Sequence, residues 1–201
     1  MSEGPAELRD AFRRIYSERE WGQGSGPGSS PANTIEYRAF IQRFIEANAV
    51  RTVTDLGCGD WQFSRFIDWS QVDYLGLDIV PEVVAQNRER FALPHIRFDV
   101  LEAIDELPGG DLLLAKEVLQ HLPNETIAAY LTAIRQRYRF ALMTNAIEPA
   151  SLVNQQIAPG GFRPIRLQNP PFNAAGAVVF AYFPHTPNYI WKNGVFPLCG
   201  A

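Results

Sequence analysis

Cysteine is scarce in this chain of 201 residues, and long apolar runs are missing. Cys58 and Cys199 provide neither a disulfide framework nor the ligand spacing of a metal site. The apolar runs are much shorter than a membrane span, and the charged residues 1–5 lack the apolar stretch of a signal peptide. We therefore expect a cytoplasmic protein that holds no metal and does not contact a membrane.

An excess of positive charge is missing as well. The formal net charge is −4, from 18 Lys and Arg against 22 Asp and Glu, and the basic residues do not cluster. This balance does not favour binding to the backbone of a nucleic acid. The composition, 46% hydrophobic and 20% charged, is ordinary for one globular domain.

What the sequence does have is a short apolar segment, 52–56, that runs into the turn 57–59 and the acid Asp60. Glycines at 57 and 59 permit a sharp turn and let a ligand approach the main chain. We expect Asp60 to cap a helix over 61–66, so that its carboxylate occupies the first helical amides. A dinucleotide site needs those amides and a third glycine, where this chain has Gln62. The turn therefore favours a ligand without pyrophosphate.

Further segments of strand type follow, and three of them run into charged residues. Asp78 ends the segment 73–78, about 20 residues beyond the turn, where a carboxylate can accept hydrogen bonds from both hydroxyls of a ribose. Asp99 lies near the end of 96–100, and Lys116 and Glu117 follow the apolar run 111–115. Because parallel strands present their carboxyl ends at one edge of a sheet, we expect these residues to share a site.

In this order, the segments resemble the motifs of class I S-adenosylmethionine (SAM)-dependent methyltransferases. The resemblance covers residues 20–185 and is specific over 53–122. It implies SAM as the cofactor, with Asp99 meeting the adenine amino group. The implied binding residues are Asp55, Gly57, Cys58, Gly59, Asp60, Trp61, Asp78, Ile79, Asp99, Val100 and Lys116, together with Gly24, Ser25, Gly26 and Tyr37 from the segment before the turn.

The glycine-rich stretch 22–31 has two interpretations. Its composition is that of a solvated linker. Related chains carry a similar element, however, and there it can fold over the cofactor as a lid, with Tyr37 nearby. Hydrogen exchange with and without S-adenosylhomocysteine (SAH) is expected to distinguish a lid from a linker.

His121 and Glu117 are the candidate catalytic residues. Methyl transfer needs an aligned nucleophile and, for some acceptors, a base, and histidine titrates in a suitable range. His121 could instead line the cleft or serve as a structural hydrogen bonder. The tetrad 169–172, Asn-Pro-Pro-Phe, is typical of amino methyltransferases, but it follows the fifth strand here, and a rigid turn explains it.

The resemblance implies an α/β fold: a Rossmann-like seven-stranded sheet, mostly parallel with one antiparallel edge strand, helices on both faces and two extra N-terminal helices. We expect 162–167 and 177–183 to be the last two strands. The whole chain, 1–201, would form one domain, with N-terminal helices and lid over 1–49, cofactor core over 50–145 and substrate side over 146–201.

The resemblance predicts methyl transfer to an unidentified acceptor, which we expect to be a small molecule. Two other functions remain open. The first is a domain that binds SAM or SAH without turnover. The second is a nicotinamide-dependent oxidoreductase, which Asp60 and Gln62 disfavour. The sequence does not indicate an oligomeric state.

Overall fold

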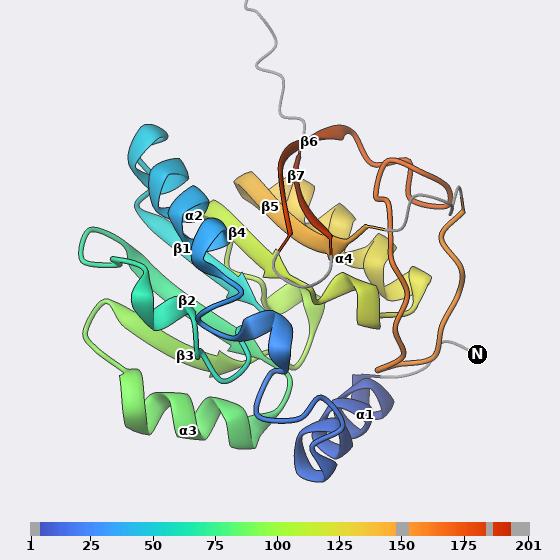
Figure 1. Ribbon diagram of the computed structural model, residues 1–201, viewed down its shortest axis with the longest axis horizontal. Coiled ribbons are helices and arrows are strands. Elements are labelled where there is room, and N and C mark those ends of the chain that lie inside the picture. The colour runs from blue at the N-terminus through green and yellow to red at the C-terminus, as the bar shows by residue number, and fades with distance from the viewer. Residues whose placement is uncertain (1–4, 148–152, 184–186, 194–201) are drawn as a thin grey trace, which may run out of the picture.

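The computed structural model describes residues 5–147, 153–183 and 187–193 (Figure 1). Cys199 lies outside these ranges. A sheet with strand order β3-β2-β1-β4-β5-β7-β6 forms the centre. Its strands are β1 (Thr52–Leu56), β2 (Asp73–Asp78), β3 (Ile96–Val100), β4 (Gly110–Lys116), β5 (Tyr138–Ala146), β6 (Gly176–Tyr182) and β7 (Asn188–Asn193).

Strands β1 to β5 pair in parallel, and β7 is antiparallel to both β5 and β6. The predicted Rossmann-like sheet of seven strands, mostly parallel with antiparallel pairing at one edge, is confirmed. Strand β7 is the one that runs against the others, and β6 forms the edge beside it. The strand order reverses between β1 and β4, where open α/β sheets bind ligands outside the carboxyl ends of their strands.

Two apolar cores lie on opposite faces of the sheet. Alternate residues of β4 divide between them, because successive side chains of a strand point to opposite faces. Leu112 and Leu114 belong to one core, and Leu113 and Ala115 to the other. The helices are α1 (Pro5–Glu18), α2 (Ile35–Ala47), α3 (Pro81–Phe91) and α4 (Asn124–Arg137).

Helices cover both faces of the sheet. Residues of α2 and α3 pack into the first core, and residues of α4 into the second. Helix α3 begins at Pro81, since a proline at the first position needs no amide partner. None of the helices in the described ranges is long and apolar enough to span a membrane.

The helix predicted over 61–66 does not form. Trp61 has a left-handed backbone, with φ of 56°, and its buried indole donates a hydrogen bond to the Tyr74 hydroxyl at 2.9 Å. Since a left-handed residue cannot continue a right-handed helix, the chain turns at Trp61 to bury the ring. Only one 3₁₀ turn, Ser64–Phe66, remains, and Asp60 caps no helix.

The strand predicted over 162–167 is also wrong. Pro164 has no amide to donate to a ladder, and the neighbouring amides have other partners. The Arg163 amide donates to the Gln120 carbonyl at 3.1 Å, and the Arg166 amide to the Asn154 side chain at 2.8 Å. The segment is a loop, and β7, which we did not predict, takes its place in the sheet.

Candidate active site

A cavity of about 790 Å³ opens where β1, β2, β4 and β5 end. This volume lies in the upper part of the range of roughly 300–1,000 Å³ that is typical of ligand pockets. Eleven of the residues predicted from the sequence line it. They are Ser25, Gly26, Asp55, Gly57, Cys58, Gly59, Asp78, Ile79, Lys116, Glu117 and His121.

The turn 57–59 wraps around the end of β2. Gly57 and Gly59 both have positive φ, 68° and 56°, which glycine adopts at little cost. The amides of Gly57 and Cys58 donate to the Leu77 carbonyl at 2.7 and 3.0 Å. The Gly59 amide donates to Oδ2 of Asp78 at 3.0 Å. The main chain of the turn therefore forms part of the cavity wall.

Asp55 and Asp78 bring two buried carboxylates to the cavity. Burial raises the pKa of each to about 6, although hydrogen bonds oppose this shift. Asp55 accepts a hydrogen bond from the Tyr74 hydroxyl at 2.6 Å. Each oxygen of Asp78 accepts one amide, from Gly59 or from Val80, at 3.0 Å. A carboxylate oxygen can accept more than one hydrogen bond, so Asp78 retains capacity for ligand hydroxyls.

Ser25 fastens the glycine-rich loop to the turn. Its hydroxyl donates to Oδ1 of Asp60 at 2.9 Å and accepts the Asp60 amide at 3.0 Å. Because a serine hydroxyl has one hydrogen, the contact of 2.9 Å with the Tyr16 hydroxyl must have Tyr16 as the donor. The Ser25 hydroxyl thereby links α1, the loop and the turn.

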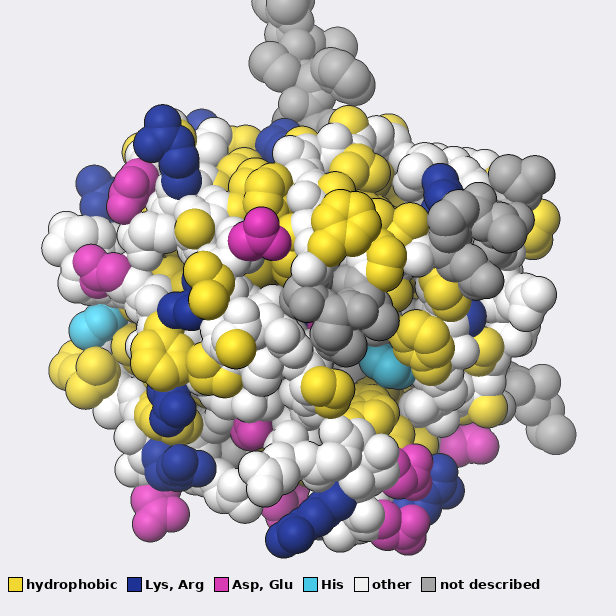
Figure 2. All heavy atoms as spheres, in the orientation of Figure 1, with side chains coloured by type: hydrophobic (Ala, Val, Ile, Leu, Met, Phe, Trp, Pro, Cys, Tyr) yellow, Lys and Arg dark blue, Asp and Glu magenta, His cyan; other side chains and the backbone are white. Residues whose placement is uncertain are grey.

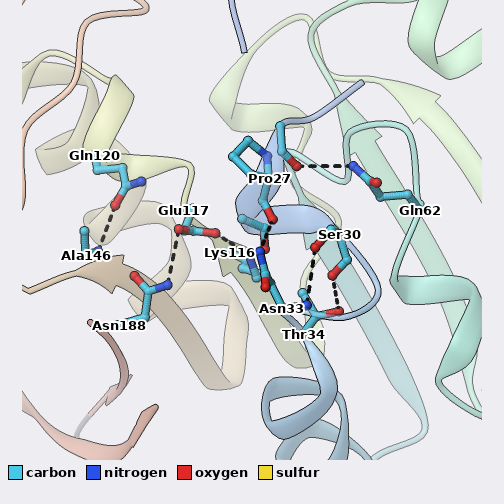
Figure 3. A network of polar contacts seen from close by, with 12 residues as sticks. Pro27, Ser30, Asn33, Thr34, Gln62, Lys116, Glu117, Gln120, Ala146 and Asn188 are labelled. Atoms are coloured by element: carbon cyan, nitrogen blue, oxygen red, sulfur yellow. Dashed lines mark hydrogen bonds and ion pairs between the residues drawn. The ribbon is translucent and has the colours of Figure 1, made fainter. Parts of the chain in front are cut away.

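A second attachment joins the loop to the end of β4 (Figure 3). The Lys116 ammonium donates to the Gly28 carbonyl at 2.8 Å and forms an ion pair with Glu117. The Asn188 amide donates to the same carboxylate at 3.3 Å. Burial alone would raise the pKa of Glu117, but Lys116 and Asn188 outweigh it and hold this pKa below its ordinary value. Glu117 has φ of 56°, a left-handed conformation that is uncommon for non-glycine residues.

His121 ends the short 3₁₀ turn Leu119–His121 beyond β4. Its Nδ1 lies 2.9 Å from the Gly161 carbonyl oxygen, which can only accept a hydrogen bond. Nδ1 therefore carries the proton, and Nε2 of the neutral ring has a lone pair. The ring lies between Trp21 and Phe162, at 4.9 and 5.7 Å between centroids. Burial lowers the pKa of His121, so the neutral form dominates at pH 7.

Six predicted residues do not line the cavity. These are Gly24, Tyr37, Asp60, Trp61, Asp99 and Val100. Tyr37 and Trp61 are buried in the core, and Asp60 holds Ser25. Gly24 packs so closely on Asp60 that an added Cβ would lie 1.8 Å from its carboxylate. These four residues support the cavity wall from behind.

Asp99 was predicted to meet an adenine, and the structure does not bring it to the cavity. The carboxylate is mostly exposed and accepts a hydrogen bond from Arg88 at 2.6 Å. Alternation along β3 explains this, because Phe98 points into the core and Asp99 away from it. Leu101 lines the cavity instead of Asp99 and Val100.

Sequence reasoning missed the wall that the N-terminal helix provides. Leu8, Phe12 and Tyr16 of α1, together with Trp21, line the cavity. Leu8, Phe12 and Tyr16 recur at helical spacing, which indicates a buried face but not what that face covers. The tetrad 169–172 forms a turn and does not reach the cavity. Among the described residues, no group of three or more His, Cys, Asp or Glu is placed to hold a metal ion.

Solved structures share this fold over nearly the whole chain. Magnesium protoporphyrin IX methyltransferase from Synechocystis PCC 6803, with bound SAM, is 15% identical, with a TM-score of 0.64 over 96% of this chain and 97% of its own. The 1,6-didemethyltoxoflavin-N1-methyltransferase of Burkholderia thailandensis, with bound 1,6-didemethyltoxoflavin and SAH, is 16% identical, with a TM-score of 0.63 over 93% of this chain and 86% of its own. DhpI in complex with SAH is 15% identical, with a TM-score of 0.61 over 94% of this chain and 95% of its own.

No protein-family model and no curated protein matches the sequence. The solved structures nevertheless show that the chain has the fold of class I SAM-dependent methyltransferases, as the motifs predicted.

Proposed function

We propose that this protein transfers a methyl group from SAM to a small-molecule acceptor. One observation carries the proposal: the glycine turn 57–59 and the buried carboxylate of Asp78 meet at one cavity, beneath a loop fastened by Ser25. In this assignment Asp78 accepts the ribose hydroxyls, and the turn and the loop hold the methionine end. Neighbours of the same fold contain SAM or SAH, which supports the choice of cofactor.

The charge of the cavity fits a sulfonium cofactor. Among the described residues that line it, the acids are Glu20, Asp55, Asp78 and Glu117, and Lys116 is the one Lys or Arg. The Lys116 ammonium is already bound to Glu117 and to the Gly28 carbonyl. Such an environment attracts cations and repels anions. We therefore expect an acceptor that is neutral or positively charged.

SAM, when bound, would supply a methyl group that the acceptor attacks in line, with SAH as the leaving group. The protein must align that acceptor and, for a hydroxyl or an N–H, remove its proton. The Nε2 lone pair of His121 is suited to take this proton. The imidazolium that results is stabilised by the charge of Glu117, which raises the pKa of His121 against the effect of burial. Trp21 and Phe162 flank the ring and can pack against the acceptor.

Two alternatives remain, and the structure bears unequally on them. A domain that binds SAM without turnover would use the same cofactor half of the cavity. A nicotinamide oxidoreductase is disfavoured. The argument from Asp60 is wrong, since Asp60 caps no helix, but Gln62 still stands where a dinucleotide site needs its third glycine. Between β1 and β2 the structure describes every residue, and the one helical turn, Ser64–Phe66, is too short to offer a pyrophosphate a helix N-terminus.

Calorimetry with SAM, SAH and NAD tests the cofactor. SAH is expected to bind and NAD to fail, and the reverse result would refute the proposal. Turnover is tested by incubating the protein with methyl-labelled SAM and small-molecule fractions of a cell extract. His121→Ala is expected to lower transfer on the order of 100-fold or more, with SAH affinity unchanged. His95→Ala, far from the cavity, is the control.

Location and partners belong to the same proposal. We expect a cytoplasmic protein that binds neither nucleic acid nor membrane. For the face it shows, Figure 2 supports the expectation about nucleic acid, because Lys and Arg lie interspersed with Asp and Glu rather than forming a basic patch. Cell fractionation and a gel-shift assay check these expectations.

A further inference from the structure

Arg163 carries a buried positive charge that the proposed reaction does not use. Its side chain belongs to the loop that replaces the expected strand 162–167, and the residue is only 6% exposed. The guanidinium donates to four oxygens of neutral groups. These are the carbonyls of Gln155 at 3.1 Å, Leu119 at 3.1 Å and Leu122 at 2.8 Å, and Oδ1 of Asn124 at 2.8 Å.

Burying a guanidinium is costly unless it is paired or fully hydrogen-bonded. None of the ion pairs among the described residues involves Arg163. Burial lowers its pKa to about 10, so the side chain is still charged at pH 7. A neutral side chain could fill this space at less cost. The charged guanidinium of Arg163 therefore indicates a role beyond packing.

The same loop holds the turn 119–122 residue by residue. The Gly160 amide donates to the His121 carbonyl at 3.0 Å, and the Arg163 amide to the Gln120 carbonyl at 3.1 Å. The Gly161 carbonyl accepts the Nδ1 proton of His121. The guanidinium takes the carbonyls of Leu119 and Leu122, on either side of this pair. The carbonyls of residues 119–122, at the end of a short helical turn, thus all accept hydrogen bonds from the loop 160–163.

We propose that Arg163 is a positioning residue: its guanidinium clamps the turn 119–122 against the loop 160–163, so that Gly161 keeps the His121 proton on Nδ1 and Nε2 free as a base. The inference rests on the proposed role of His121. A bidentate, planar donor suits this task better than an ammonium, because several carbonyls in fixed directions must be bound at once.

The charges that act on His121 predict a second effect of Arg163. Burial beside Trp21 and Phe162 has the largest effect and lowers the pKa of His121. The hydrogen bond to Gly161 and the charge of Glu117 raise this pKa, and the charge of Arg163 lowers it. Loss of the Arg163 charge should raise this pKa, whereas a weaker hydrogen bond to Gly161 should lower it, so the tautomer is the decisive readout. A residue that only filled space would change neither the pKa nor the tautomer.

Nitrogen NMR of the imidazole rings tests the proposal without an acceptor, with His121→Gln assigning the signal. In the unmodified protein we expect the Nδ1–H tautomer. Arg163→Met should populate both tautomers of His121, because the clamp on the Gly161 hydrogen bond is lost. Arg163→Lys, which retains the charge, should keep the pKa low yet mix the tautomers. Arg97→Met, exposed on β3, is the matched control.

Two results would overturn the clamp: the Nε2–H tautomer in the unmodified protein, or a full Nδ1–H tautomer in a folded Arg163→Lys. Arg163→Lys keeps the test valid if Arg163→Met does not fold. Calorimetry with SAH separates this proposal from the preceding one, because the clamp lies apart from Asp78. Normal SAH binding by both variants is expected. Failure of SAH to bind the unmodified protein would refute the cofactor but leave the tautomer result intact.

Discussion

At the scale of single residues, Asp78 and Asp99 form a natural pair for testing the cofactor site. Both lie at the ends of adjacent strands, but only Asp78 lines the cavity. Asp78→Ala should weaken SAH by on the order of 2–4 kcal/mol, the loss of two charge-assisted hydrogen bonds. Calorimetry should show Asp99→Ala within about twofold of the unmodified protein, a difference near 0.4 kcal/mol. Equal losses in the two variants would contradict the assignment.

The raised pKa of Asp78 makes SAH binding depend on pH. Hydroxyl donors prefer the ionised carboxylate, so the complex must have a lower pKa than the value of about 6 in the free protein. Below pH 6 binding therefore releases a proton, and affinity should fall up to about tenfold per pH unit between pH 6 and pH 5. Above pH 7 it should be constant.

Asp78→Asn, which cannot titrate, provides the control for this pH dependence. Its SAH affinity should vary little over the same range. If the dependence persists in the variant, Asp55 is responsible, because burial raises its pKa to about 6 as well. Tighter binding by the unmodified protein at pH 5 than at pH 7 would be the wrong sign for a carboxylate that accepts ligand hydroxyls.

At the scale of elements, the glycine turn is packed against the loop that covers it. A Cβ at Gly59 would lie 2.2 Å from the Ser25 hydroxyl, whereas one at Gly22 would meet nothing within 4 Å. Both glycines have positive φ, so alanine costs roughly 1 kcal/mol of backbone strain at either position. Gly22→Ala should show only this cost in thermal unfolding. Gly59→Ala should unfold at a lower temperature than Gly22→Ala and lose SAH binding.

The loop 22–31 is docked through few side chains, and Ser25 makes the most connections. Ser25→Ala removes the links to Tyr16 and Asp60, so hydrogen exchange across 22–31 should become faster without ligand. SAH should restore part of the protection if the loop is a lid. Ser30→Ala, which loses one contact with the Asn33 amide, is the control. Unchanged exchange in Ser25→Ala would reduce 22–31 to a linker.

Elements with a strong local signal could be predicted from the sequence. The helix 81–91 begins at a proline, and the parallel strands are apolar runs. Elements decided by distant contacts could not. Trp61 does not continue a helix, because its indole donates a hydrogen bond to the Tyr74 hydroxyl. The Arg163 amide donates to the Gln120 carbonyl instead of to a neighbouring strand. Strand β7 is short, and polar residues flank its apolar centre, so only its pairing with β5 and β6 reveals it.

At the scale of the whole molecule, the strand ends of the candidate site were more predictable than its outer walls. Strand ends place Asp55, Asp78 and Glu117 together because parallel topology dictates it. The wall made by α1 and the clamp by Arg163 depend on tertiary placement, which leaves no local trace in the sequence. Asp99 is the opposite case: its strand was predicted, but the face of β3 to which its side chain points was not.

The position of β7 determines when the cavity is complete during synthesis. The cofactor half of the cavity lies at the turn 57–59 and Asp78, and its proposed acceptor half at Glu117 and His121. A ribosome makes β1 to β4, and with them Asp55, Asp78 and Glu117, well before Asn188. Until β7 inserts between β5 and β6, the hydrogen bond from Asn188 to Glu117 is missing, and β5 is an open edge. The cofactor half can thus mature on the nascent chain before β7 is made, whereas the acceptor half is completed only after β7 pairs with β5.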